Sequence, residues 1–179
     1  GAEAIIVLAN FANTLDKVLP SIPSLKHVIT TEIGDLFPFL KRTVVNFTVK
    51  HIKKMVHPYT IPHAVTFNAA LSKGAQSVFH NTVIDSQDIA LLQYTGGTTG
   101  VAKGAMLTHR NLVANVLQAS SWIAPMHFSS EDVIVTALPL YHIFSLTANC
   151  LTFLKVGAKN ILITNPRDVN RFINKSSKH

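Results

Sequence analysis

Glycines, threonines and one lysine stand together in YTGGTTGVAKGA, which begins at Tyr94. Glycines permit a tight turn and let backbone N–H groups come close to an anion. The hydroxyls of Thr95, Thr98 and Thr99 are further donors, and Lys103 adds a positive charge. These residue types predict a loop that holds a polyphosphate from several sides.

Two well-known phosphate loops do not fit this stretch. A Walker A loop has its lysine directly after the last glycine and a hydroxyl residue next. Here Lys103 comes before Gly104, and Ala105 follows. The dinucleotide fingerprint G-x-G-x-x-G cannot be laid over GGTTGVAKG either. A plain Gly/Thr turn between two strands stays open as an alternative.

The elements that must position this loop alternate between strands and helices. Apolar runs predict strands over 4–10, 27–30, 88–95, 104–109, 132–138 and 160–164. Helices are expected from Asn13 or Thr14 to Val18, over 109–122, from His142 to near Gly157, and over 165–175. The alternation predicts an α/β fold with a largely parallel sheet and flanking helices, with ligands at the carboxyl ends of the strands.

Local signals set some of these boundaries. Thr108 is a candidate N-cap for the 109–122 helix, whose apolar stripe is Leu112, Val116 and Ala119. Gly157 is expected to end the helix before it. Prolines at 58 and 62 predict an irregular connection.

A basic region lies between Asp35 and Asp85, where the chain has six Lys or Arg residues and no acidic one. Within residues 41–57, helical spacing joins the apolar residues Val45, Val49, Ile52 and Val56. A basic amphipathic helix can lie on an anionic membrane or meet nucleic acid, but the lysines here are not interleaved with stacking aromatics. A solvated helix that packs on its own domain is the alternative.

Composition excludes several classes of protein. With 47% hydrophobic and 14% charged residues the chain is not disordered. No apolar run reaches the roughly 18 residues of a membrane-spanning helix. The single cysteine, Cys150, rules out a disulfide framework and is expected in the core. The nine histidines lack metal-ligand spacing, so no metal ligand is predicted.

Two stretches resemble one family. YTGGTTGVAKGAMLTHRNL is similar to the AMP-binding signature of the adenylate-forming acyl-CoA synthetases, and ALPLYHIFSLT resembles the next motif of that family. The sequences of these two motifs, together with NILITNPRD, are most similar to those of bacterial long-chain fatty-acid–CoA ligases. Ala102 departs from the proline that many relatives have before the Lys-Gly pair.

The resemblance implies a two-step reaction: a fatty carboxylate attacks the α-phosphate of Mg-ATP, and the thiol of coenzyme A then displaces AMP. It implies that His142 lies beside the reacting carboxylate as the catalytic residue, and that Tyr141, His142 and Phe144 contact the acyl substrate. Tyr141, Ile143 and Phe144 are expected to form the wall of the acyl tunnel. Capping of the following helix is the alternative for His142. The residues that the resemblance assigns to ATP are Tyr94, Thr95, Gly96, Gly97, Thr98, Thr99, Gly100, Val101, Ala102, Lys103, Gly104 and Ala105.

The resemblance also implies that this chain is part of a large N-terminal domain and is inactive alone. The magnesium-binding motif of the family is absent from it. Residues 1–87 are expected to form a partial α/β subdomain with the basic insertion, and residues 88–179 to carry the two motifs. A cytoplasmic enzyme is expected, with peripheral contact to the inner face of the membrane. Expected partners are fatty acid, ATP, coenzyme A and the rest of the chain, not nucleic acid, and a homodimer stays open. Another adenylate-forming ligase and a non-catalytic nucleotide-binding module are the alternatives.

Overall fold

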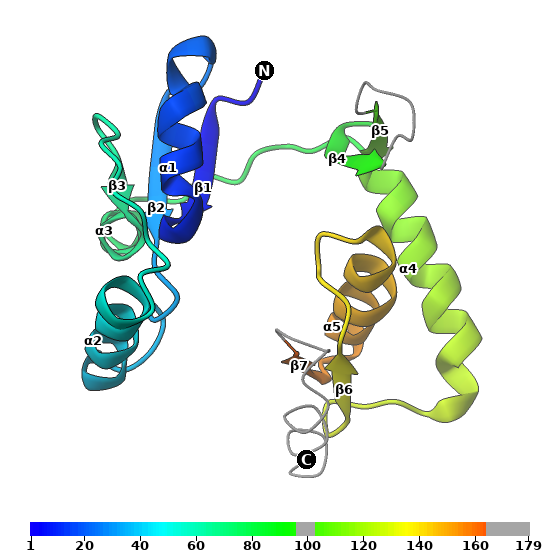
Figure 1. Ribbon diagram of the computed structural model, residues 1–179. Helices are drawn as coiled ribbons and strands as arrows, with labels where there is room; N and C mark the ends of the chain where they lie inside the picture. The colour runs from blue at the N-terminus through cyan, green and yellow to red at the C-terminus, as the bar shows by residue number, and fades with distance from the viewer. Residues whose placement is uncertain (96–102, 164–179) are drawn as a thin grey trace. The chain divides into compact units, whose positions relative to one another are not determined.

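The computed structural model describes residues 1–95 and 103–163. The chain forms two compact units that divide between Asn81 and Thr82. The described strands belong to three small sheets (Figure 1), and in two of these every pairing is parallel. This confirms the predicted α/β fold with mainly parallel strand pairing. The predicted helix over 165–175 lies outside the described residues.

The N-terminal unit is built on three parallel strands, β1 (Ala4–Leu8), β2 (His27–Thr31) and β3 (Val65–Thr66), in the order β1-β2-β3. Helix α1 (Ala9–Val18) and a short 3-10 turn (Leu19–Ser21) connect β1 to β2. The core of this unit combines the helix, the sheet and the later connection. Its buried members are Ala12, Leu15, Val28 and Ile61.

Helix α1 begins earlier than its sequence predicts. It starts at Ala9, directly after β1, and not at Asn13 or Thr14. Ala9 is buried in the first turn, so tertiary packing sets the start of the helix, and no side chain caps it. The amide of Asn13 instead donates a hydrogen bond of 2.6 Å to the carbonyl of Pro58.

Helix α2 (Phe39–Phe47) continues into a π-helical turn (Thr48–Ile52). The predicted apolar stripe is only partly right, because Val45 and Val49 are half-buried whereas Ile52 is 67% exposed. A π-helical turn contains more residues than an α-helical turn, so the helical spacing that would place Ile52 beside Val45 and Val49 no longer holds. The irregular connection around Pro58 and Pro62 is confirmed.

Strand β3 and helix α3 (Phe67–Ala75) were not predicted. The strand has only two residues, which is too short for alternation to be recognised. Thr66 was the sequence signal that could have predicted the start of α3. It is the N-cap residue, and its hydroxyl accepts a hydrogen bond of 3.4 Å from the N–H of Ala69.

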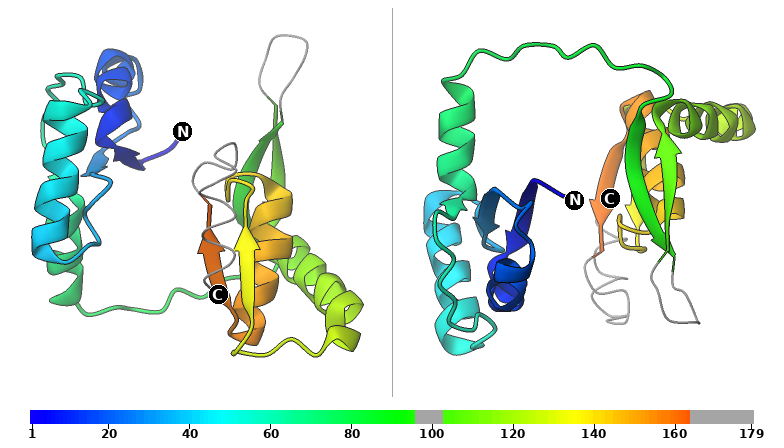
Figure 2. Two further views of the ribbon diagram at one scale, coloured as in Figure 1. Left: turned by 60° about the horizontal axis from the view of Figure 1, so that its bottom comes forward. Right: turned by 90° about the horizontal axis from the view of Figure 1, so that it is seen from above.

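The C-terminal unit contains an antiparallel pair, β4 (Ile89–Thr95) and β5 (Lys103–Thr108), and a parallel pair, β6 (Val133–Thr136) and β7 (Lys159–Leu162). Helix α4 (His109–Ile123) and a 3-10 turn (Ala124–Met126) lead from β5 to β6. A π-helical segment (Ser145–Leu151) and α5 (Thr152–Val156) lead from β6 to β7. The turned views of Figure 2 show β6 and β7 side by side along this last helix.

The predicted ends of two helices are confirmed. Gly157 ends α5 in the left-handed conformation, with φ of 81°. At the start of α4, the Thr108 hydroxyl accepts from the N–H of Asn111 at 3.2 Å, and the Asn111 carbonyl oxygen Oδ1 accepts from the N–H of Thr108 at 3.0 Å. This reciprocal pair satisfies two backbone donors that the first helical turn leaves free.

Replacing Thr108 with alanine is expected to lower the free energy of unfolding by about 1 kcal/mol, because the Asn111 N–H loses its acceptor. Urea unfolding of the 179-residue chain, followed by circular dichroism, measures the change. Thr108→Ser keeps the hydroxyl and is the matched control. Equal midpoints for the alanine and serine variants would contradict the role of the cap.

Candidate functional site

The β4–β5 hairpin brings the two ends of the Gly/Thr loop together. Tyr94 pairs with Gly104 and Thr95 with Lys103 across the antiparallel ladder. The Thr95 hydroxyl also donates a hydrogen bond of 3.3 Å to the carbonyl of Lys103. Gly96, Gly97, Thr98, Thr99, Gly100, Val101 and Ala102 lie outside the described residues. The described part of the site therefore consists of the two paired strands from which the loop extends.

The side chains at the end of this hairpin face solvent. Tyr94 is 62% exposed, and Lys103 is exposed as well. A Cβ atom built on Gly104 would lie 3.5 Å from the ring of Tyr94, so this ring covers the glycine. Among the described residues the one ion pair joins Lys26 to Glu3, and Lys103 has no carboxylate partner there. No carboxylate of the described residues therefore competes with an anion for its ammonium group.

The second motif forms a tight turn between β6 and the following helix. The His142 N–H donates to the carbonyl of Pro139 at 3.0 Å, and the His142 carbonyl accepts from the N–H of Leu146 at 3.0 Å. The hydroxyl of Ser145, which is fully buried, donates to the carbonyl of Leu138 at 2.8 Å. Hydrogen bonds on both sides of His142 thus fix its backbone, although its side chain is exposed.

One ring nitrogen of His142 is already engaged. Nδ1 accepts a hydrogen bond of 3.3 Å from the N–H of Phe144 at the start of the helix. A neutral imidazole that accepts at Nδ1 carries its proton on Nε2. The histidine therefore makes a capping contact and at the same time presents an N–H donor at Nε2.

A cavity of about 550 Å³ lies next to this turn, between β5, α4 and the helix that follows His142. Its lining residues are Leu107, Asn111, Leu112, Asn115, Ile143, Phe144 and Thr147. Ile143 and Phe144 are the members that the sequence assigned to the acyl site. Tyr141 and His142 do not line it, and Tyr141 is 82% exposed.

Sequence reasoning missed the α4 side of this cavity. Leu112 was identified only as part of the helix stripe, which is confirmed, since Leu112, Val116 and Ala119 are all half-buried. Asn111 and Asn115 are four residues apart and therefore share a helix face. That spacing was the available signal, but nothing local indicated which element they would meet.

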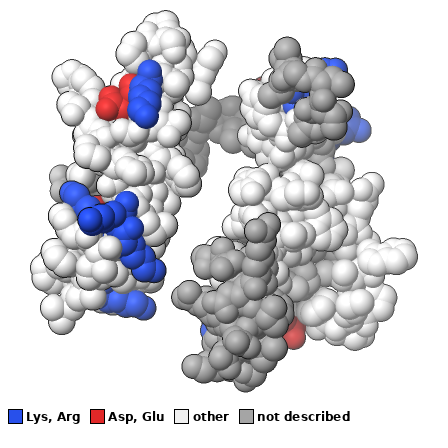
Figure 3. Space-filling model, viewed as in Figure 1, with Lys and Arg blue, Asp and Glu red and all other residues white. Residues whose placement is uncertain are grey.

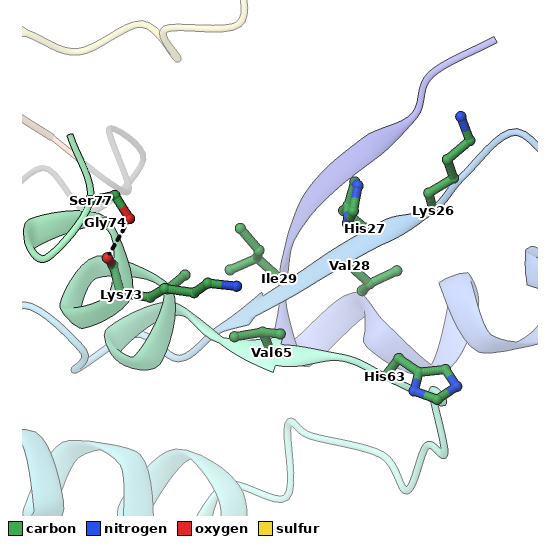
Figure 4. A pocket seen from close by; sticks show the side chains of 10 residues that line it. Lys26, His27, Val28, Ile29, His63, Val65, Lys73, Gly74 and Ser77 are labelled. Atoms are coloured by element: carbon green, nitrogen blue, oxygen red, sulfur yellow. Dashed lines mark hydrogen bonds between the residues drawn. The ribbon is translucent and has the colours of Figure 1, made fainter. Parts of the chain in front are cut away.

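The N-terminal unit has a separate hollow of about 430 Å³, formed by β2, β3 and α3 (Figure 4). Lys26, His27, His63 and Lys73 are among its lining residues. Ser77 hydrogen-bonds the carbonyl of Lys73 at its rim. None of the residues predicted to do chemistry lines this hollow.

Within the part of the chain that the structure describes, no helix is long and apolar enough to cross a membrane. In the same residues, no group of three or more His, Cys, Asp or Glu side chains could hold a metal ion. Cys150 is half-buried in the π-helical segment and carries a free thiol.

Comparison with known proteins gives a consistent result. Residues 1–177 match the model of the family described as AMP-binding enzyme. The chain is 50% identical over 179 residues to a long-chain-fatty-acid–CoA ligase of Salmonella typhimurium, and 53% identical over 183 residues to one of Haemophilus influenzae. Each alignment covers 100% of this chain and 32% of the relative, so the chain spans about a third of their length.

Solved structures include a fatty acyl-adenylate ligase from L. pneumophila in complex with acyl adenylate and pyrophosphate. It is 28% identical, with a TM-score of 0.53, over 91% of this chain and 26% of that one.

Proposed function

Because the chain belongs to the family of AMP-binding enzymes, we propose that the complete protein is a long-chain fatty-acid–CoA ligase. In the first half-reaction, a carboxylate oxygen of the fatty acid attacks the α-phosphorus of ATP, and the bond to pyrophosphate breaks. In the second, the sulfur of coenzyme A attacks the acyl carbonyl and AMP leaves, while the thiol proton passes to solvent. The products are acyl-CoA, AMP and diphosphate.

The observation that carries this proposal is identity of about half of all positions, over the whole chain, to relatives named as long-chain-fatty-acid–CoA ligases. The described geometry supports it. The hairpin holds Thr95 and Lys103 opposite each other, and a cavity opens beside the His142 turn.

In this proposal the residues from Tyr94 to Ala105 bind the β- and γ-phosphates of ATP. Negative charge develops on the departing pyrophosphate, and fixed donors together with Lys103 stabilise it. Magnesium would bind together with ATP, because Mg²⁺ is usually held by substrate phosphates and only a few protein ligands. We assign it no ligand in this chain.

His142 would donate from Nε2 to the carboxylate or phosphate oxygen and hold it for in-line attack. Phe144 lines the cavity of about 550 Å³, which is within the size range of small-molecule sites and is proposed as the start of the acyl site. Tyr141 would contact the acyl substrate from the exposed side of the turn.

The proposal includes a place of action. A long-chain fatty acid partitions into bilayers, so an enzyme on the cytoplasmic side that contacts the inner face of the membrane peripherally meets its substrate there. Its partners would be fatty acid, ATP and coenzyme A, with a homodimer left open.

The test is ATP–pyrophosphate exchange by the complete protein with a panel of carboxylates. We expect exchange with palmitate that far exceeds exchange with acetate, an aromatic acid or an amino acid. Exchange supported best by an amino or aromatic acid would indicate another adenylate-forming ligase. ATP binding without exchange for any carboxylate would indicate a nucleotide-binding module.

A further inference from the structure

Helix α2 carries an apolar face that its own unit does not cover. The exposed side chains on this side, and in the turn before the helix, form what we name the α2 apolar face: Leu36, Phe39, Leu40, Val44 and Phe47. Leu40 is 79% exposed and Phe39 is 69% exposed. At about 100° per residue, the four helical members fall within about 140° of the circumference. A contiguous exposed apolar group of this kind marks an interaction surface.

The opposite side of α2 is the one that packs. Val45 and Val49 are half-buried there. On the flank of the helix, about 20° of rotation from Phe39, the Asn46 side chain accepts from the N–H of Gly34 and donates to a carboxylate oxygen of Glu32, both at 2.8 Å. These contacts fix the rotation of the helix and direct the α2 apolar face outward.

Positive charges surround this face. Lys41 Nζ lies 4.2 Å from the centre of the Phe37 ring, and the guanidinium carbon of Arg42 lies 5.5 Å from the centre of the Phe39 ring. Three more exposed cations follow in and after the π-helical turn, namely Lys50, Lys53 and Lys54. Figure 3 shows Lys and Arg side chains gathered over the part of the unit that holds α2.

Two half-buried carboxylates, Glu32 and Asp35, precede α2. Asp35 accepts from the Thr31 hydroxyl at 3.1 Å and from the N–H of Glu32 at 2.7 Å, and Glu32 accepts from Asn46. Within the described residues neither carboxylate forms an ion pair with a cation of this region. No acidic residue follows until Asp85.

We infer that the α2 apolar face, with its five cations, docks onto an anionic lipid bilayer. The apolar side chains would enter the boundary between headgroups and acyl chains, and the cations would meet lipid phosphates, as in interfacial amphipathic helices. A nucleic acid fits less well, because nucleic-acid interfaces are polar. Another protein surface, including the rest of this protein, would bury the same apolar side chains, and the fluorescent probe at Leu40 described below distinguishes it from a bilayer. The inference deepens the localisation within the proposed function and does not depend on the ligase reaction.

Vesicle co-sedimentation of the complete protein tests the charges. We expect binding to phosphatidylcholine vesicles that contain phosphatidylglycerol and much weaker binding to phosphatidylcholine alone. Reversing Lys50, Lys53 and Lys54 to glutamate should weaken the binding about a hundredfold or more, because each of the three cations near an anionic surface strengthens it about fivefold. The matched control reverses Lys17, Lys155 and Lys159, which are also exposed. An equal loss in both variants, or no binding by the unmodified protein, would overturn the inference.

An environment-sensitive fluorophore tests the apolar face separately. A nitrobenzoxadiazole probe on Leu40→Cys, in a protein without other cysteines, should brighten and shift to the blue when phosphatidylglycerol vesicles are added. The same probe at Lys17→Cys should not change. A blue-shifted Leu40 probe before any vesicle is added would mean that another part of the protein covers this face, and would sink the inference.

The two proposals fail in different ways. If the charge-reversed protein loses vesicle binding but keeps exchange activity with fatty acid supplied in solution, both stand. Absent exchange with intact vesicle binding would refute the ligase and leave the α2 inference in place.

Discussion

Replacing Lys103 with alanine in the complete protein is expected to lower the rate of ATP–pyrophosphate exchange by about two to three orders of magnitude. Lys103 stands opposite Thr95 at the end of a hairpin, is exposed, and has no carboxylate partner among the described residues. In the proposed reaction, its charge would be available to the departing pyrophosphate. A charge that grows in the transition state is stabilised most by a donor already in position.

Lys155→Ala is the matched control for this prediction. It also removes an exposed lysine of the C-terminal unit, but from α5 and away from the hairpin. The exchange rate is measured at saturating ATP and fatty acid, so that weaker binding is separated from slower chemistry. If Lys103→Ala and Lys155→Ala exchange at the same rate, Lys103 has no role in adenylation.

His142→Asn is expected to lower the exchange rate by about two orders of magnitude while leaving stability almost unchanged. The asparagine Oδ1 can accept the hydrogen bond from the Phe144 N–H, as Nδ1 does at 3.3 Å in the native chain. What the variant lacks is the donor at Nε2. The substitution thus separates the capping contact from the proposed contact with substrate.

Two further variants complete this test. His142→Gln carries an amide donor that reaches further than asparagine, so it should recover part of the activity. His142→Ala should lose the activity and also lower the unfolding midpoint, since the Phe144 N–H loses its acceptor. An asparagine variant that exchanges at the native rate would leave His142 a capping residue only.

The hairpin, the cap and the helix end could be predicted because the interactions that define them are local. Thr108 and Asn111 are three residues apart, and the left-handed turn at Gly157 depends on one residue that tolerates positive φ. The strands on both sides of the Gly/Thr loop could be predicted from apolar runs and from the chain reversal that the glycines allow. For these elements, side-chain chemistry and backbone preference act within a few residues.

Packing between distant segments explains the failures. Helix α1 starts at Ala9 because that residue is buried, and no cap indicates this. The predicted stripe of the basic region included Ile52, which the π-helical turn exposes. Strand β3 exists only because β2 accepts it as a neighbour. Propensity is a weak guide wherever tertiary contacts compete with it.

By itself the sequence predicted the chemistry proposed for this protein, from a Gly/Thr/Lys loop between two strands and a histidine in a second motif. Only the tertiary structure decided which surfaces surround that chemistry. It brought Asn111 and Asn115 of α4 and Phe144 together around one cavity, and it left the α2 apolar face exposed. The physical reason is that a motif acts through residues close in sequence, whereas a cavity or an exposed face depends on which distant segments bury their apolar surface together.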